Sequence, residues 1–307
     1  MDSIYFSHEH EQLREQIARF IAREVEPFAE QWERDGFTPR EVLRKMGDAG
    51  LLGLMYSSAH GGAEADALTN LVFAEALSQS TYGGFIITVL VHTDMASPHL
   101  HHAGTPAQKA KYLPGVIAGK TITAVAISEP GAGSDLAGLS TRAVRDGDEY
   151  VVNGQKIWTT SGMHGDWIFC LVRTDPTVKK QSGIGFLLID LATPGVEVRP
   201  IVNATTDRDF CEVFLKDVRV PAENMVGAPT QGWQIANHVL RHERGADIAV
   251  LHYGDLLDEI AQRARSARRG SARISDDARF RQRWSALRIE YEVLRQGVLA
   301  ALAALKD

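Results

Sequence analysis

The first hundred residues place apolar side chains at steps of three and four. One such stripe runs through Leu13, Ile17, Phe20, Ile21, Val25 and Phe28, and this spacing is one face of a helix. Thr38-Pro39-Arg40-Glu41 and Thr105-Pro106-Ala107-Gln108 each place a threonine before a proline, and both patterns predict a helix that begins with a capping box. We expect an all-helical N-terminal domain over residues 1–118.

After Gly119 the apolar period changes to two, which is typical of strands. The expected strands lie near residues 121–127, 149–152, 155–160, 167–173, 185–190, 196–200 and 210–220. Asn153-Gly154 predicts a two-residue hairpin with a type I′ turn. On the strand after that turn, Trp158 and Thr160 lie two residues apart and so share a face. We expect a small β-barrel or sandwich domain over residues 119–229.

From Gly232 the helical period returns. Its stripe runs through Ala236, Val239, Leu240, Glu243, Ala246 and Val250. A second long helix is expected from Asp277 to Leu305, after an arginine-rich connector over residues 263–273. We therefore expect a C-terminal helical bundle over residues 230–307 and an α+β multidomain chain in which two helical domains flank a β domain.

Composition and charge exclude some classes of function. The formal net charge is −6, whereas a general nucleic-acid surface needs a basic excess to displace counterions. Cys170 and Cys211 form no Cys-x-x-Cys pair, so neither a disulfide framework nor a zinc site is indicated. The N-terminus lacks the regions of a signal peptide, and the longest apolar run, residues 85–91, is too short to cross a bilayer. We expect a soluble, cytoplasmic protein with no membrane span and no nucleic-acid partner.

Two segments carry the most specific chemistry. Residues 126–135 read AISEPGAGSD, a tight polar turn whose backbone N–H groups can face an anion. Trp158-Thr159-Thr160 offers a flat ring a stacking surface and hydroxyl groups. A flavin-binding site needs both features, the backbone N–H groups for the diphosphate and the flat surface for the ring. At this spacing, in a chain of helical, β and helical regions, the two segments resemble those of the acyl-CoA dehydrogenase family, FAD enzymes that oxidise an acyl-CoA thioester between its α and β carbons.

The resemblance implies roles for individual residues. Ser128 takes the position that contacts the pyrimidine edge of the flavin, and Ser134 the one near the FAD diphosphate and the CoA thioester. Trp158 is expected to pack on the flavin, with Thr160 hydrogen-bonding near its N5 atom. The implied FAD-binding set is Ile127, Ser128, Gly133, Ser134, Trp158, Thr159 and Thr160. Taken singly, the turn and the tryptophan would be ordinary structural features.

Glu243 is the candidate catalytic base. It lies on the apolar stripe of its helix, where desolvation would raise the pKa of a carboxyl group and strengthen it as a base. The resemblance agrees, because the isovaleryl-CoA and long-chain branches place their glutamate here, just before an arginine. Arg244 then resembles the arginine beside the acyl-CoA channel. Glu243 would remove the α-proton while flavin N5 accepts the β-hydride, giving trans-2-enoyl-CoA. An ordinary ion pair is the alternative role for Glu243.

The sequence also departs from the family after residue 250. The Arg-x-x-Phe-Gly motif, whose arginine reaches the FAD of a neighbouring subunit, is absent, and no spacing selects Arg268 or Arg269 in its place. Compared with the family, the C-terminal bundle lacks its last helices, and their absence would leave an apolar face exposed. The residues expected on that face are Leu294, Val298, Leu299, Leu302 and Leu305. We therefore expect an obligate homo- or hetero-oligomer.

Other functions remain open on the sequence. The chain could be a non-catalytic or partner-dependent subunit, or an acyl-CoA oxidase or flavin monooxygenase on the same fold. For a dehydrogenase, an electron-transfer flavoprotein is the implied electron acceptor. His92, His99, His101 and His102 suggest a metal cluster, but no carboxylate or cysteine sits at ligand spacing, so no metal site is expected.

Overall fold

The computed structural model describes residues 4–243 and 247–304, with the side chains of residues 239, 241–243 and 247–252 left undescribed. The chain divides into two compact units. The helical unit comprises Met1–Pro27, Ala65–Gly83 and Gly245–Asp307, and the sheet unit comprises Phe28–Glu64 and Gly84–Arg244. The predicted fold class is confirmed, since helical regions precede and follow a middle sheet. The boundaries of the three sequence domains stay a prediction.

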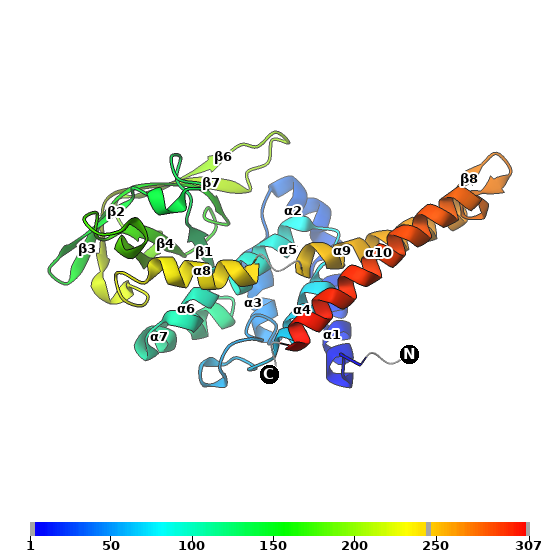
Figure 1. Ribbon diagram of the computed structural model, residues 1–307, viewed down its shortest axis with the longest axis horizontal. Helices are drawn as coiled ribbons and strands as arrows, with labels where there is room; N and C mark the ends of the chain where they lie inside the picture. The colour runs from blue at the N-terminus through cyan, green and yellow to red at the C-terminus, as the bar shows by residue number, and fades with distance from the viewer. Residues whose placement is uncertain (1–3, 244–246, 305–307) are drawn as a thin grey trace. The chain divides into compact units, whose positions relative to one another are not determined.

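The helical unit contains four long helices. They are α1 (His8–Glu24), α4 (Ala67–Leu77), α9 (Asp247–Ser266) and α10 (Ala278–Ala303). Helices α9 and α10 lie side by side and are joined at one end by a hairpin of β8 (Arg268–Arg269) and β9 (Ala272–Arg273) (Figure 1). Asp277 caps α10 by accepting hydrogen bonds from the backbone N–H groups of Arg279 and Phe280. The long second helix was thus predicted correctly, apart from its end beyond the described residues.

The apolar face expected on α10 is only partly exposed. Leu299 is buried against Leu68 and Leu71 of α4, and Val298 and Leu302 pack on the same cluster. That part of the prediction was wrong because helix α4, far away in the sequence, covers these side chains. Leu294 remains exposed, and Leu305 lies outside the described residues. Among the described side chains of α9 and α10, the other exposed large apolar ones are Tyr253, Leu256, Ile260, Leu287, Ile289 and Val293.

A buried carboxylate joins three helices of the helical unit. Glu75 of α4 accepts a hydrogen bond from Arg14 of α1 at 2.8 Å and another from Arg295 of α10 at 3.1 Å. Because Glu75 is buried, the two guanidinium groups offset the cost of removing its charge from water.

The sheet unit is built on seven strands. They are β1 (Thr123–Ala126), β2 (Arg142–Asp146), β3 (Glu149–Thr160), β4 (Trp167–Arg173), β5 (Ile184–Asp190), β6 (Val196–Ile201) and β7 (Phe210–Pro221). Their order is β1-β4-β2-β3-β7-β6, with β5 paired to β4. β1 runs parallel to β4, while β3, β6 and β7 are antiparallel neighbours. The sheet buries an apolar cluster that includes Val152, Ile168, Cys170, Ile189, Cys211 and Val213.

Helices complete the sheet unit. They are α2 (Ala29–Asp35), α3 (Arg40–Asp48), α5 (Gly83–Leu90), α6 (Pro98–Ala103), α7 (Pro106–Ile117) and α8 (Gly232–Glu243), with a π-helical turn over Val91–Ala96. Helix α8 lies along the sheet beside β4 and β5 (Figure 1). Trp233, Ile235 and Ala236 of α8 pack with Phe186 and Leu188 of β5.

The two predicted capping boxes had different outcomes. The Thr105 hydroxyl accepts from the Gln108 N–H, and the Gln108 side chain accepts from the Thr105 N–H, so the box before α7 is confirmed. Helix α3 instead begins at Arg40 with Pro39 as its N-cap and no side-chain cap. The box expected at Thr38 is therefore wrong, because the Thr38 side chain is buried instead of turned to the helix end.

The hairpin predicted at Asn153-Gly154 was also wrong. Strand β3 continues through these residues, and the turn falls at Gly147-Asp148, before it, where the unpredicted strand β2 pairs back onto β3. Gly147 has a φ of +60°, which suits a tight turn. At Gly154 the pairing with β7 shifts register, and a Cβ there would lie 2.5 Å from the Thr141 hydroxyl oxygen. The glycine thus permits a close approach within a bulge.

Candidate functional site

The end of β3 presents Trp158 outward in an unusual backbone conformation. The Trp158 side chain is 56% exposed and its φ is +62°, a value that a bulky residue rarely adopts. The β3–β7 pairing shifts register between Lys156 and Thr159, so Trp158 lies in a second bulge. Its ring meets Phe210 of β7 edge-on, at 6.0 Å between centroids. Such strained residues gather at ligand sites, and an exposed indole is a surface for a flat ring.

Thr159 points the other way. It is 1% exposed, and among the described residues its Oγ1 atom has no hydrogen-bond partner. Its carbonyl accepts from the Cys211 thiol at 3.2 Å, which ties this end of β3 to β7. Thr160, the next residue, is half-buried. A buried hydroxyl without a partner is costly, and within the described part of the chain nothing offsets that cost for Thr159.

The glycine-rich turn follows β1 and lies against β3. Glu129 and Ala132 exchange backbone hydrogen bonds of 3.1 and 3.0 Å, which closes the turn. The Ile157 N–H donates to the Ser128 carbonyl at 3.0 Å. The structure therefore brings Ser128 next to the strand that carries Trp158, as the resemblance implies.

The far side of the turn is open. Gly133 and Ser134 are exposed, and a Cβ at Gly131 or Gly133 would meet nothing within 4 Å. Ile127 and Ser128, at the start of the turn, are half-buried. The glycines thus leave backbone N–H groups accessible, as a diphosphate cradle requires.

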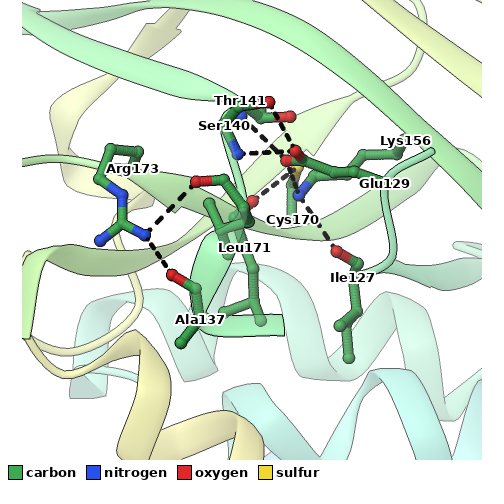
Figure 2. Close-up of polar contacts among 10 residues, drawn as sticks. Ile127, Glu129, Ala137, Ser140, Thr141, Lys156, Cys170, Leu171 and Arg173 are labelled. Carbon is green, nitrogen blue, oxygen red and sulfur yellow. Dashed lines mark hydrogen bonds and ion pairs between the residues drawn. The ribbon is translucent and has the colours of Figure 1, made fainter. Parts of the chain in front are cut away.

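An ion pair joins the two segments, and it was not predicted from the sequence. The Lys156 ammonium lies 2.9 Å from Oε1 of Glu129, and the two side chains are 0% and 3% exposed. The same ammonium donates to the Ile127 carbonyl at 3.2 Å (Figure 2). A signal was present in the sequence: Tyr150, Val152 and Lys156 fall on the core-facing phase of β3, where a lysine requires a buried partner.

Glu129 is saturated with donors. Oε2 accepts from the Ser140 N–H at 2.6 Å and from its hydroxyl at 2.8 Å, while Oε1 accepts from the Thr141 N–H at 2.9 Å (Figure 2). Burial opposes ionisation of this carboxyl group, but Lys156 and these hydrogen bonds outweigh it and lower the pKa of Glu129 to about 2. The site therefore holds a buried carboxylate in its charged form.

The chain after the turn is held by an arginine. Arg173 of β4 donates to the Ala137 carbonyl at 2.7 Å (Figure 2). It also donates to the Leu139 carbonyl at 3.4 Å. These bonds fix the segment that leads from the turn to Ser140 and Thr141, so the donors to Glu129 are themselves supported.

The predicted base lies at the edge of what the structure describes. Glu243 is the last residue of α8, but its side chain is outside the described set, and Arg244 lies wholly outside the described residues. The start of the helix is well fixed, since a Cβ on Gly232 would lie 2.4 Å from the carbonyl carbon of Gly185 in β5. The roles of Glu243 and Arg244 stay predictions.

The histidines have structural partners. His92 is buried, with Nε2 3.0 Å from the Val116 carbonyl and Nδ1 3.3 Å from the Thr123 backbone nitrogen. His99 is buried against Phe186, with ring centroids 4.3 Å apart, and His102 stacks on His238. Among the side chains that the structure describes, no three from His, Cys, Asp or Glu are grouped as ligands of a metal ion. Across residues 4–243 and 247–304, no helix has the length and apolar content needed to cross a membrane.

Comparison with known proteins places the chain in a family. The profiles of the acyl-CoA dehydrogenase N-terminal, middle and C-terminal domains match residues 7–120, 124–218 and 230–307. The chain therefore belongs to the acyl-CoA dehydrogenase family, and the resemblance is confirmed. FAD is the cofactor of this family.

Individual relatives agree. The long-chain specific acyl-CoA dehydrogenase of Rattus norvegicus mitochondria is 34% identical over 252 residues, which cover 80% of this chain and 58% of that protein. The chain thus spans less than two thirds of that relative. The crystal structure of an acyl-CoA dehydrogenase from Geobacillus kaustophilus superposes with a TM-score of 0.92 at 32% identity, covering 98% of this chain and 80% of that one. The ChsE4-ChsE5 complex of Mycobacterium tuberculosis gives 0.87 at 30% identity, with coverages of 99% and 78%.

The described residues fit FAD at one wall of its site. Trp158 offers an exposed indole, and the turn around Gly133 offers an open backbone. These features come from different strands and loops, yet the hydrogen bonds from Ile157 to Ser128 and from Lys156 to Ile127 hold them together.

Proposed function

We propose that this chain, with FAD bound, catalyses α,β-dehydrogenation of an acyl-CoA thioester to the trans-2-enoyl-CoA. The observation that supports it most is the exposed indole of Trp158, on a strand that is hydrogen-bonded to the Ser128 turn. FAD, when bound, supplies the acceptor for the hydride that leaves the β carbon. The chain supplies the wall that orients the ring.

Glu243 is the base in this proposal. Its position at the end of α8 follows a helix that packs firmly on β5 through Trp233, Ile235 and Ala236, so the helix can hold a carboxylate in place. It would take the α-proton as the β-hydride departs.

Two further residues complete the proposed substrate contacts. Arg244 would lie beside the acyl-CoA channel, and the exposed Ser134 hydroxyl would face the thioester end of CoA. Both contacts are to parts of the substrate that every acyl-CoA shares, so they bind the class of substrate without selecting a chain length.

Loss of the base gives a direct test. Glu243→Gln is nearly the same size and removes the carboxylate, so turnover should fall about 100-fold or more. Glu259→Gln is the matched control, because Glu259 is exposed on α9 and, among the described residues, pairs with Arg263. Near wild-type turnover of Glu243→Gln would reject Glu243 as the base.

An electron-transfer flavoprotein is the proposed electron acceptor, and the oxidase or monooxygenase reaction is the alternative. The two are separated by reoxidation in air. In a dehydrogenase, oxygen reoxidises the reduced flavin much more slowly than the enzyme turns over, and only the acceptor protein reoxidises it fast. Rapid reoxidation by oxygen would instead favour the oxidase or monooxygenase.

We also propose that the chain works as an oligomer. Tyr253, Leu256 and Ile260 of α9 and Leu287 and Val293 of α10 are exposed, and apolar side chains in this number favour association. A structural relative, ChsE4-ChsE5 of Mycobacterium tuberculosis, is a two-protein complex, so a partner-dependent subunit is the second candidate. Light scattering that shows a stable monomer would contradict the oligomer, and a flavin band that appears only with a partner protein would favour the second candidate.

A further inference from the structure

Lys156 and Glu129 have no part in the proton and hydride transfers proposed above. Yet they form a buried ion pair in the sheet unit, with a 2.9 Å contact and exposures of 0% and 3%. Burying two charges is expensive and often weakens a fold compared with apolar residues of similar volume. A pair placed here therefore calls for an explanation beyond stability.

The position of the Lys156–Glu129 pair relative to the two proposed flavin-binding segments supplies an explanation. Glu129 directly follows Ser128 in the turn, and Lys156 comes two residues before Trp158 on β3. The Lys156 ammonium also donates to the Ile127 carbonyl at 3.2 Å, and the adjoining Ile157 N–H to the Ser128 carbonyl at 3.0 Å. The pair therefore clamps the turn to the strand at the point where both are expected to meet the ring.

We propose that Lys156 and Glu129 are positioning residues for FAD and that their balanced charges help to set the reduction potential of the bound flavin. The inference rests on the proposed placement of the flavin against Ser128 and Trp158. The reason is electrostatic: uptake of a hydride adds one negative charge to the flavin. In a poorly solvated interior, a neighbouring unpaired cation favours that added charge and an unpaired anion opposes it.

The effects of Lys156 and Glu129 can be tested one at a time, because each keeps other hydrogen bonds when its partner is replaced. The Glu129 carboxylate keeps three hydrogen bonds, from Ser140 and Thr141, when Lys156 is removed. The Lys156 ammonium keeps the Ile127 carbonyl when Glu129 is neutralised. Each single substitution thus leaves one buried charge of known sign beside the same two segments.

The test uses the FAD-loaded protein with its partner chain, if it has one. The midpoint potential of the flavin is measured by equilibration with redox dyes in Glu129→Gln, Lys156→Met and the double variant. We expect Glu129→Gln to raise the potential, Lys156→Met to lower it, and the double variant to lie close to wild type. Each single variant should also bind FAD about tenfold more weakly or worse, by the usual effect of misplacing a preorganised site.

A merely structural pair would behave differently. Loss of either partner would then loosen the same site and move the potential in the same direction, or leave it unchanged. Either result overturns the proposal. The matched controls are Glu149→Gln and Arg219→Met, which remove an exposed ion pair of 2.9 Å at the other end of β3; these should leave the potential unchanged.

A wild-type measurement covers the case in which single variants fail to fold. The buried Lys156 ammonium should give a slowly exchanging ¹⁵N–¹H signal, and this signal should shift when the bound flavin is reduced by dithionite. An unchanged signal overturns the proposal. Chemical reduction also separates this test from the proposed reaction: a flavin that no acyl-CoA thioester reduces would reject the dehydrogenation, while opposite potential shifts would still support the clamp.

Discussion

Trp158 and Thr159 are neighbours on β3 with opposite surroundings. The Trp158 side chain is 56% exposed, while the Thr159 side chain is buried and its Oγ1 atom has no partner among the described residues. The bulge between Lys156 and Thr159, with a φ of +62° at Trp158, produces this arrangement. A flat ligand placed here could stack on the exposed indole, while Thr159 anchors this end of β3 in the interior.

Removal of the indole should weaken FAD binding without weakening the fold. In Trp158→Ala we expect the dissociation constant of FAD to rise about tenfold, since a ring–ring contact contributes up to about 1.5 kcal/mol beyond its buried area. Stability of the protein without FAD should change by less than about 0.5 kcal/mol, because the side chain is exposed. Flavin fluorescence titration and urea unfolding measure the two quantities.

Val144 provides the control for that substitution. It is 58% exposed and lies on β2 opposite Val151, at the other end of β3 from Trp158, so Val144→Ala should leave FAD affinity unchanged. Equal affinity of Trp158→Ala and wild type would show that the indole does not contact the ring.

Removal of the Thr159 hydroxyl should stabilise the protein without FAD and weaken its binding of FAD. Thr159→Val keeps the shape and removes a buried group without a hydrogen bond, so the protein without FAD should become more stable by about 1 kcal/mol. FAD should also bind more weakly, because the proposed FAD-binding set includes the Thr159 hydroxyl, which must turn toward the ring to bond it. Thermal unfolding with and without FAD tests both effects.

Thr38 is the matched control, since its hydroxyl is also buried without a partner but lies before α3. Thr38→Val should stabilise both forms equally. If Thr159→Val also stabilises both forms equally, the Thr159 hydroxyl has no part in binding FAD.

Acid should expose the contribution of Glu129 to stability. Folding lowers the pKa of this group from 4.5 to about 2, so its stabilising effect is complete above pH 4.5 and is lost as the pH falls to about 2. At neutral pH, Glu129→Gln leaves the Lys156 charge buried and unpaired and should cost about 3–5 kcal/mol. The difference in unfolding free energy between wild type and variant should shrink as the pH falls through that window. A pH-independent difference would contradict an ionised Glu129.

The start of α8 depends on two glycines. In Gly232→Ala the new Cβ would meet the backbone of Gly185 at 2.4 Å, so the helix that carries Glu243 must shift. We expect a loss of about 1–3 kcal/mol in stability together with a fall in turnover. Gly297→Ala on α10 is the control, where nothing lies within 4 Å; it should stabilise the protein by up to about 1 kcal/mol. Unchanged stability of Gly232→Ala would contradict the close approach.

The sequence allowed much of the architecture to be predicted, because periodicity reports which face of an element is buried. Strand β7 and helix α10 were recognised by period alone. The hairpin failed at Asn153-Gly154 because the same dipeptide also suits a bulge, and the Asn153 side chain pairs with Asp217 of β7 instead of closing a turn. Local sequence does not distinguish a turn from a bulge when the partner strand lies far along the chain.

The site was predicted in part for a similar reason. Trp158 and the glycine-rich turn are visible in sequence, but the Lys156–Glu129 pair depends on how two distant segments meet. Likewise, Leu299 is buried because it packs against α4, and nothing in the C-terminal sequence indicates that contact. Packing between elements far apart in the chain is the part that periodicity does not report.

The most direct test of the proposed function is the absorption spectrum of the purified protein, recorded without oxygen as acyl-CoA thioesters are added. We predict a bound flavin whose band is bleached by at least one saturated thioester in the wild-type protein, and bleached about 100-fold more slowly or worse in Glu243→Gln. A flavin that no thioester bleaches, or equal bleaching in the two proteins, would contradict the proposed chemistry of this site.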